Sequence, residues 1–250
     1  MASVDTPDDQ LSLLPSGVVP ANVWAWNDDI PATELASRIG SKHSWDPRGR
    51  QYWYEGFESA VLQWNTAFVG ASTLTRSNVT SWLGQYSAVN NIPAVFNNGM
   101  TMTKSFVRPR NYRIGLQIFF SCDSANWLTI EFQNNHYTGA RRYRSDLIID
   151  RASGEMDITT GGAPVAVGRI FNNRADAHFW HQIKLVCDFS TNYYQRLLFD
   201  GVEYDLTQYP MDSIGSGIAE RFDVNIITKN APGGITNFYF DEIVYSDMEP

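Results

Sequence analysis

Residues 178–206, HFWHQIKLVCDFSTNYYQRLLFDGVEYDL, carry the clearest structural pattern in the chain. From 179 to 189 apolar residues occupy every second position, with His181 as the exception, and mostly polar residues stand between them. This period of two is typical of a strand with one face in a core and the other in water. A polar break follows, and the later pair Asp200-Gly201 favours the type I′ turn of a β-hairpin. The stretch therefore predicts a β-meander.

The chain after residue 50 is divided into further short runs of this kind. They lie at 82–89, 100–107, 112–120, 127–133, 141–150, 154–160, 164–171, 222–226 and 236–246. Many short strands separated by turns, with almost no helical periodicity, predict an all-β fold. We expect an antiparallel two-sheet jelly-roll sandwich over residues 51–250. The polar loops at 90–99 and 208–219 are the expected place for a binding site, because loops carry most binding residues.

Residues 1–50 differ from the rest and predict an extended N-terminal docking arm. Five of the eleven prolines fall here, and no alternation lasts long enough for a sheet strand. One short helix is expected after Asp28 or Asp29. The residues expected to dock are Trp24, Trp26, Leu35, Ile39 and Trp45. Their large apolar surfaces favour burial, either on another protein subunit or on the edge of the chain's own sandwich.

The composition bears on several classes of partner. A net charge of −8 and a pI near 4.9 disfavour duplex nucleic acid and anionic membranes, since both attract a basic face. No apolar run approaches the roughly eighteen residues of a membrane span, and MASVDTPDDQ lacks the pattern of a secretory signal. We therefore expect neither nucleic acid nor membrane as partner. Cys122 and Cys187 are too few for a disulfide framework and are expected to be buried apolar side chains.

The meander also carries a family resemblance. Trp180 is followed by alternating apolar residues, Asp188, a polar turn, an aromatic strand and the Asp-Gly hairpin. This order resembles the concanavalin-A-like superfamily of laminin-G, glucanase and lectin jelly rolls, and the resemblance covers residues 55–250. It implies the sandwich fold. It leaves the function open, because this architecture hosts lectins, glycan-cleaving enzymes and structural modules.

A possible catalytic motif lies at Glu203-x-Asp205-x-x-Gln208. It is similar to the E-x-D-x-x-E strand of the family 16 glycoside hydrolases, in which alternate carboxylates share one strand face. A retaining glycosidase needs two carboxyl groups about 5–5.5 Å apart, one as nucleophile and one as acid. Here Gln208 replaces the third acid, which removes the proton donor. We therefore expect no enzymatic activity.

Two further acids suggest a metal. Glu58 stands in a GFE sequence and Asp241 in FYFDEIVY, and several β-sandwich carbohydrate-binding modules have acids in similar places. The resemblance implies a structural calcium ion held by Glu58 and Asp241, with no other cofactor. Calcium needs six to eight oxygen ligands, however, and two acids are a minimal set. The alternative is that each is a solvated acid or a hydrogen-bond acceptor in a turn.

Arginines and tyrosines form a candidate site for glycans or anions. Its members are Arg108, Arg110, Arg113, Tyr137, Arg141, Arg142 and Tyr143, with Arg144 close by. If the strands near 112 and 141 are neighbours, the guanidinium groups form a basic patch suited to carboxylates or phosphates. The tyrosines could stack on sugars. The alternative is ordinary charge at the rim of loops.

We interpret the chain as a non-catalytic structural or adhesive subunit of a larger assembly, with a lectin-like sandwich. By analogy with bacteriophage surface and tail proteins, we expect it on a virion or another extracellular particle. Its partners would be other protein subunits and surface glycans. The alternatives are a carbohydrate-binding module and a glycoside hydrolase of the same fold.

Overall fold

The structure is a computed structural model that describes residues 48–95, 98–107, 111–124, 127–170, 176–231 and 233–250. The chain divides into two compact units, Met1–Arg48 and Gly49–Pro250. The residues predicted to dock, from Trp24 to Trp45, lie outside the described residues, as does the predicted short helix. The docking arm therefore stays a prediction, and the second unit is described below.

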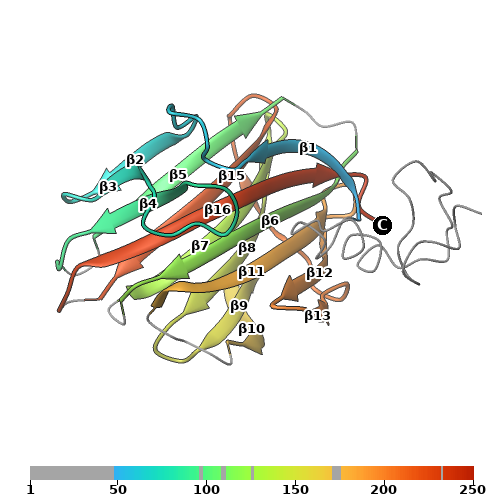
Figure 1. Ribbon diagram of the computed structural model, residues 1–250. Coiled ribbons are helices and arrows are strands. Elements are labelled where there is room, and N and C mark those ends of the chain that lie inside the picture. The colour runs from blue at the N-terminus through green and yellow to red at the C-terminus, as the bar shows by residue number, and fades with distance from the viewer. Residues whose placement is uncertain (1–47, 96–97, 108–110, 125–126, 171–175, 232) are drawn as a thin grey trace, which may run out of the picture. The chain divides into compact units, whose positions relative to one another are not determined.

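The described residues form sixteen β-strands and no helix, which confirms the predicted all-β class. The first sheet has the order β13 (Val202–Asp205), β12 (Tyr193–Phe199), β11 (Asp176–Asp188), β6 (Arg113–Cys122), β16 (Thr236–Asp247), β4 (Ser87–Ile92) and β3 (Thr73–Ser77), with β1 (Arg50–Glu55) beside β16. The second has the order β10 (Ala163–Arg169), β9 (Glu155–Thr160), β8 (Arg141–Asp150), β7 (Trp127–Tyr137), β15 (Arg221–Asn230), β5 (Gly99–Phe106) and β2 (Asn65–Val69), with β14 (Asp212–Gly215) beside β8. The two sheets lie face to face as the predicted sandwich (Figure 1).

The meander at 178–206 folds as its sequence predicts. It forms β11, β12 and β13 as successive antiparallel neighbours. Asp200 and Gly201 have φ angles of 46° and 84°, and a type I′ turn needs positive φ at both positions. His181, the exception in the alternation, faces inward among aromatic rings, with its Nδ1 2.7 Å from a carboxylate oxygen of Asp200. The turn therefore supplies the partner that a buried imidazole requires.

The core lies between the sheets, where each contributes alternate side chains. Ile114, Leu116 and Ile118 of β6 are buried, and the ring of Phe120 lies 5.6 Å from the ring of Phe132 on β7. Cys122 and Cys187 are free, buried thiols. Within the described ranges no helix is long and apolar enough to span a membrane.

Three segments differ from their predictions. The region 90–99, predicted to be a loop, contains the end of β4 and the first residue of β5. The run at 82–89 becomes a strand only from Ser87, because the carboxylate of Asp241 accepts hydrogen bonds from the backbone N–H groups of Trp82 and Leu83. These two N–H groups bond to a side chain and are therefore not available for pairing with a neighbouring strand. The region 208–219, predicted to be a loop, contains the short strand β14, which pairs with the start of β8.

The outer face of the first sheet carries a buried ion cluster. The carboxylate of Glu249 lies 2.9 Å from the Lys184 ammonium and 2.7 Å from the Arg196 guanidinium. All three residues are almost completely buried, with exposed fractions of 4%, 2% and 7%. Ser246 also donates a hydrogen bond to Glu249. The C-terminal residues are therefore fixed against the sheet by charge-assisted hydrogen bonds.

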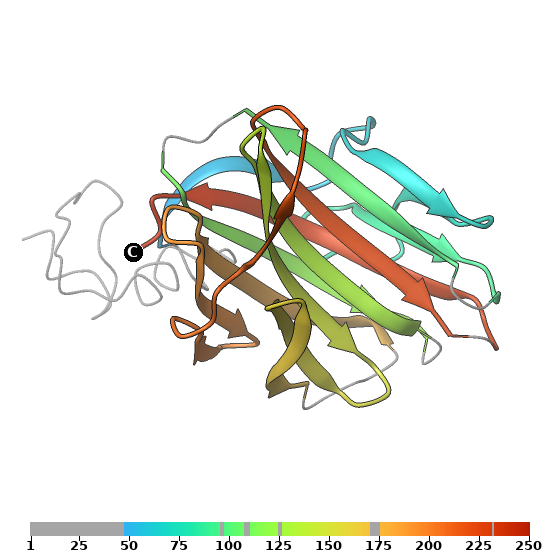
Figure 2. The same ribbon diagram turned by 180° about the vertical axis from the view of Figure 1, so that it is seen from behind.

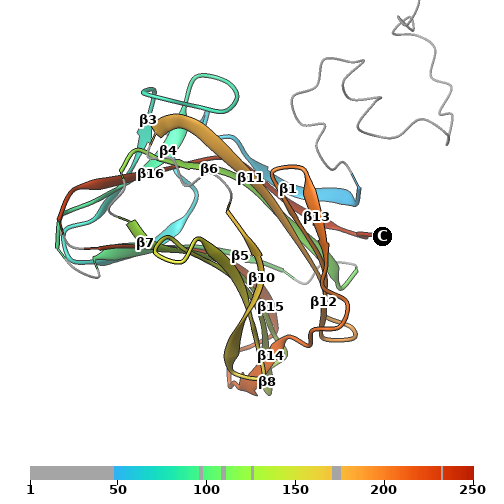
Figure 3. The same ribbon diagram turned by 90° about the horizontal axis from the view of Figure 1, so that it is seen from below.

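Both sheets bend in the same direction, and the second lies on the inside of the bend (Figure 3). The outer face of the second sheet is therefore concave. Figure 2 shows this sheet from its outer side, with β5, β15, β7 and β8 side by side. A concave sheet surrounds a ligand on more sides than a flat or convex one, which makes this face the place to look for a site.

Candidate functional site

The concave face is built from side chains that alternate with the core. Ile130 and Phe132 of β7 point inward and are fully buried, so Glu131 and Gln133 point outward. Strand register aligns the outward residues in three rows across the sheet. The rows are Thr103, Asn225, Gln133 and Asp146; Ser105, Asp223, Asn135, Arg144 and Asp212; and Arg221, Tyr137, Arg142 and Ile214. We call these three rows the polar face.

Hydrogen bonds connect the first row across three strands. The Thr103 hydroxyl donates to the side-chain oxygen of Asn225 at 2.8 Å. The Asn225 amide nitrogen donates to the side-chain oxygen of Gln133 at 3.1 Å, and the Gln133 nitrogen donates to Glu131. Each side chain therefore fixes the orientation of the next, and the row presents an ordered sequence of donors and acceptors.

Ion pairs occupy much of the other two rows. Arg144 lies 2.7 Å from a carboxylate oxygen of Asp146 and 3.6 Å from one of Asp212. Arg221 lies 2.9 Å from Asp223. Burial raises the pKa of Asp146 to about 7, against the opposing attraction of Arg144. The charges of Arg144 and Arg221 are therefore compensated within the face.

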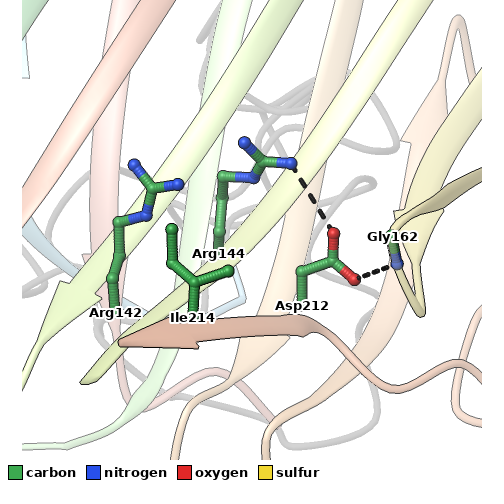
Figure 4. Close-up of a pocket in the computed structure, with 5 residues that line it drawn as sticks. All are labelled: Arg142, Arg144, Gly162, Asp212 and Ile214. Carbon is green, nitrogen blue, oxygen red and sulfur yellow. Dashed lines mark hydrogen bonds and ion pairs between the residues drawn. The ribbon is translucent and has the colours of Figure 1, made fainter. Parts of the chain in front are cut away.

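A small pocket opens at one end of the polar face (Figure 4). Its volume is about 220 Å³, and it is lined by Arg142, Arg144, Gly162, Asp212 and Ile214. Asp212 accepts a 2.8 Å hydrogen bond from the Gly162 N–H. The side chain of Arg142 makes no ion pair or hydrogen bond with any residue in the described ranges, and its Nε is buried. The pocket thus holds one compensated and one uncompensated guanidinium group.

The first sheet supports this face from inside. Tyr194 of β12 is fully buried. Its hydroxyl accepts a 2.9 Å hydrogen bond from the backbone N–H of Asp146 and donates one of 2.9 Å to the carbonyl oxygen of Thr159. These bonds fix β8 and β9 of one sheet to a strand of the other, so the backbone below Asp146 is held from both sides.

The structure brings together only part of the predicted glycan or anion site. Arg108 and Arg110 lie outside the described residues. Arg113 belongs to the other sheet and lies 3.2 Å from Asp188. Of the residues on β8, Arg142 lines the pocket, while exposed Arg141 donates a hydrogen bond to Ser213.

The two tyrosines of that set do not present open rings. Tyr137 is 7% exposed, and the Arg221 guanidinium lies over its ring, 5.2 Å from the centroid. Tyr143 packs against the core, with its ring 6.3 Å from that of His136. The geometry therefore favours Arg142 over the tyrosines as a ligand contact.

The predicted metal ligands Glu58 and Asp241 hold the same loop. Asp241 accepts hydrogen bonds of 2.8 and 3.0 Å from the N–H groups of Trp82 and Leu83. One oxygen of Glu58 accepts 2.8 and 3.0 Å bonds from residues 85 and 86. No group of three or more His, Cys, Asp or Glu side chains within the described ranges could hold a metal. The acceptor alternative accounts for these oxygens, and calcium stays a prediction.

The predicted glycosidase motif lies far from the polar face in the sheet order. Glu203 and Asp205 stand on β13, the edge strand of the first sheet, and both are exposed. Asp205 accepts hydrogen bonds from the backbone N–H and the hydroxyl of Thr207, so it serves its own turn. Gln208 is exposed in the following turn. The absence of a catalytic role for this motif stays a prediction.

Comparisons with known proteins give the fold and leave the function open. No protein-family model and no curated protein matches the chain. The chain is similar to a solved endo-β-1,4-glucuronan lyase from the fungus Trichoderma reesei, with 11% identity, a TM-score of 0.53, and 79% of this chain and 96% of that one covered. It is also similar to the cellulose induced protein Cip1, with 12% identity, a TM-score of 0.52, and 78% and 97% covered. At such identities the likeness shows a common jelly-roll architecture.

Proposed function

We propose that this chain binds carbohydrate through the polar face. The observation that carries the proposal is the first row, in which Thr103 and Asn225 are partly exposed on the concave face. The buried side chains of Gln133 and Asp146 continue the row in register on the next two strands. A sugar hydroxyl both donates and accepts hydrogen bonds, as do the hydroxyl and amide side chains of this row. An ordered set of such groups therefore matches a sugar better than it matches an apolar surface.

A comparison of the outer faces of the two sheets also favours the polar face as the glycan site. The first sheet has the cluster of Glu249, Lys184 and Arg196 on its outer side, and all three residues are almost completely buried, so a ligand cannot reach their charges. On the second sheet Asn225 and Thr103 are partly exposed, so a ligand can reach them. The shared fold is compatible with a glycan ligand, since the name of the lyase records a polysaccharide substrate.

We propose binding without catalysis. A retaining glycosidase requires two carboxyl groups about 5–5.5 Å apart at the scissile bond. Glu203 and Asp205 are exposed at a sheet edge, and Gln208 stands where the third acid is expected. The isolated protein should therefore not hydrolyse laminarin or lichenan. Turnover that disappears in Glu203→Gln would contradict this part of the proposal.

A glycan array followed by titration calorimetry tests the binding. Asn225→Ala removes one donor and one acceptor from the polar face and should weaken the binding of any glycan found about three- to tenfold, the value of one or two hydrogen bonds. The matched control is Asn91→Ala. Asn91 is also a partly exposed strand residue with a side-chain hydrogen bond, but it lies on β4 of the other sheet. If no glycan binds, or if both variants behave alike, the polar face is not a glycan site.

The assembly role remains a second prediction. It rests on the arm at residues 1–50, nearly all of which lies outside the described residues, and on an analogy for its virion setting. The glycan proposal is preferred because the described residues bear on it directly.

A further inference from the structure

We propose that the pocket beside Arg142 is a subsite for an anionic substituent of a sugar, either a carboxylate or a sulfate. This inference rests on the proposed function, because it names the class of glycan that the polar face prefers. Its basis is the difference between Arg142 and the neighbouring arginines.

Among the arginines of the three rows of the polar face, Arg142 is the one without a carboxylate partner in the described residues. Arg144 has two carboxylate neighbours, Asp146 and Asp212. Arg221 is paired with Asp223. The side chain of Arg142 has neither an ion pair nor a hydrogen bond within the described ranges, and its cross-strand neighbours, Tyr137 and Ile214, carry no charge. The fold therefore supplies a counter-charge for the other two arginines and none for this one.

The position of Arg142 makes an anion favourable there. The residue is partly buried, and its Nε is withdrawn from water without a partner. A charge that is partly desolvated and unpaired is costly. A guanidinium group presents its donors in a planar fork that matches a carboxylate or a sulfate. An anionic ligand would therefore offset a cost that the free protein bears.

The pocket lining favours a charged group attached to a sugar ring over a free ion. In Figure 4 the side chains of Arg142 and Arg144 stand on the same side of the strands, with Ile214 between them. Ile214 is 51% exposed, so it offers an apolar surface beside the charge. A pyranose has apolar C–H faces as well as its substituents. The ring would lie on Ile214 while its acidic group meets Arg142.

The placement of the charges in the pocket also favours an anionic ligand beside Arg142. The carboxylates of Asp212, in the lining, and of Asp146, beside it, are both paired with Arg144, so Arg142 is the guanidinium group of the lining without an acidic partner. Asp212 is already held by the Gly162 N–H and by Arg144. At about 220 Å³ the pocket is smaller than the usual ligand site of about 300–1,000 Å³, so it suits one ring of a longer chain.

Matched ligand pairs test the inference. In the first arm, titration calorimetry compares oligogalacturonides with their methyl esters, in which a methyl group replaces the charge of the carboxylate. In the second arm, sulfated oligosaccharides are compared with their desulfated counterparts. We expect the anionic member of at least one pair to bind about ten- to a hundredfold more tightly, the range expected of charge-assisted hydrogen bonds.

Two variants locate the effect. Arg142→Gln should abolish the preference for the anionic ligand and leave the affinity for the neutral one almost unchanged. Arg141→Gln is the matched control, because it removes the same charge from the adjacent residue, which is exposed and bonded to Ser213. It should keep the preference. Circular dichroism and thermal unfolding of both variants establish that each is folded.

The outcomes separate the inference from the proposed function. Equal affinity for both members of both pairs, or a preference that survives in Arg142→Gln, would overturn the anionic subsite while glycan binding stands. Absence of binding to every glycan of the array and of both arms would overturn the proposed function, and the subsite with it.

Discussion

Replacing Glu249 by Gln should strongly destabilise the sandwich. The Glu249 carboxylate lies within 3 Å of both the Lys184 ammonium and the Arg196 guanidinium, and all three residues are almost fully buried. The amide of the substituted side chain would keep one oxygen acceptor but no charge, so two buried cations would lose their shared counter-charge. Removing one partner of a buried pair costs about 3–5 kcal/mol. For a domain of about 200 residues this corresponds to a fall in Tm of roughly 6–20 °C.

Urea unfolding followed by circular dichroism at pH 7 measures this change in the free energy of unfolding. Glu203→Gln is the matched control, because it makes the same chemical change at an exposed residue of β13. It should shift the unfolding free energy by less than about 0.5 kcal/mol. An equally small change in Glu249→Gln would refute the argument that the cluster is a buried, mutually dependent set of charges.

Three further predictions follow from the acids and from the arm. Burial raises the pKa of Asp146 to about 7, against about 3.9 in an unfolded chain. The protonated Asp146 side chain therefore contributes its full stabilisation below about pH 4, and this contribution is lost as the pH rises to 7. Urea unfolding of Asp146→Asn across this range should show a flatter pH dependence than the wild-type protein, and parallel curves would be evidence against a raised pKa. If Glu58 and Asp241 hold calcium, a chelator should lower the melting temperature, since a ligand bound only by the native state stabilises it; an unchanged melting curve would retire the metal site. If Trp24 and Trp26 anchor the chain to another subunit, replacing both by Ala should weaken that association by orders of magnitude in sedimentation experiments, whereas a change in thermal stability alone would indicate packing within the chain.

The sequence predicts structure well where the signal is local. The meander follows from alternation and from Asp200-Gly201, all within thirty residues. The segment before Ser87 was wrongly predicted as strand, because the acceptor for its N–H groups is Asp241, 159 residues away. Alternation alone does not reveal such a competitor.

The polar face could not be predicted from the sequence for a similar reason. Asn225 and Gln133 meet across 92 residues of chain, and the register that aligns them is set by strand pairing over the whole sheet. The arginines at 141–144 were visible as a cluster. Which of them remains uncompensated depends on Asp146 and on Asp212 of β14, a strand that the sequence did not indicate.

The alternation along β7 separates two kinds of evolutionary constraint. Ile130 and Phe132 must fit their neighbours in the core, where even small changes in volume are felt. Glu131 and Gln133 point to the outer side, where side-chain hydrogen bonds join them to each other and to Asn225. Substitutions at these outward positions can therefore accumulate with little effect on folding, so ligand preference can diverge while the architecture persists. Such a sheet is also a practical scaffold for directed evolution, with the randomised positions confined to every second residue.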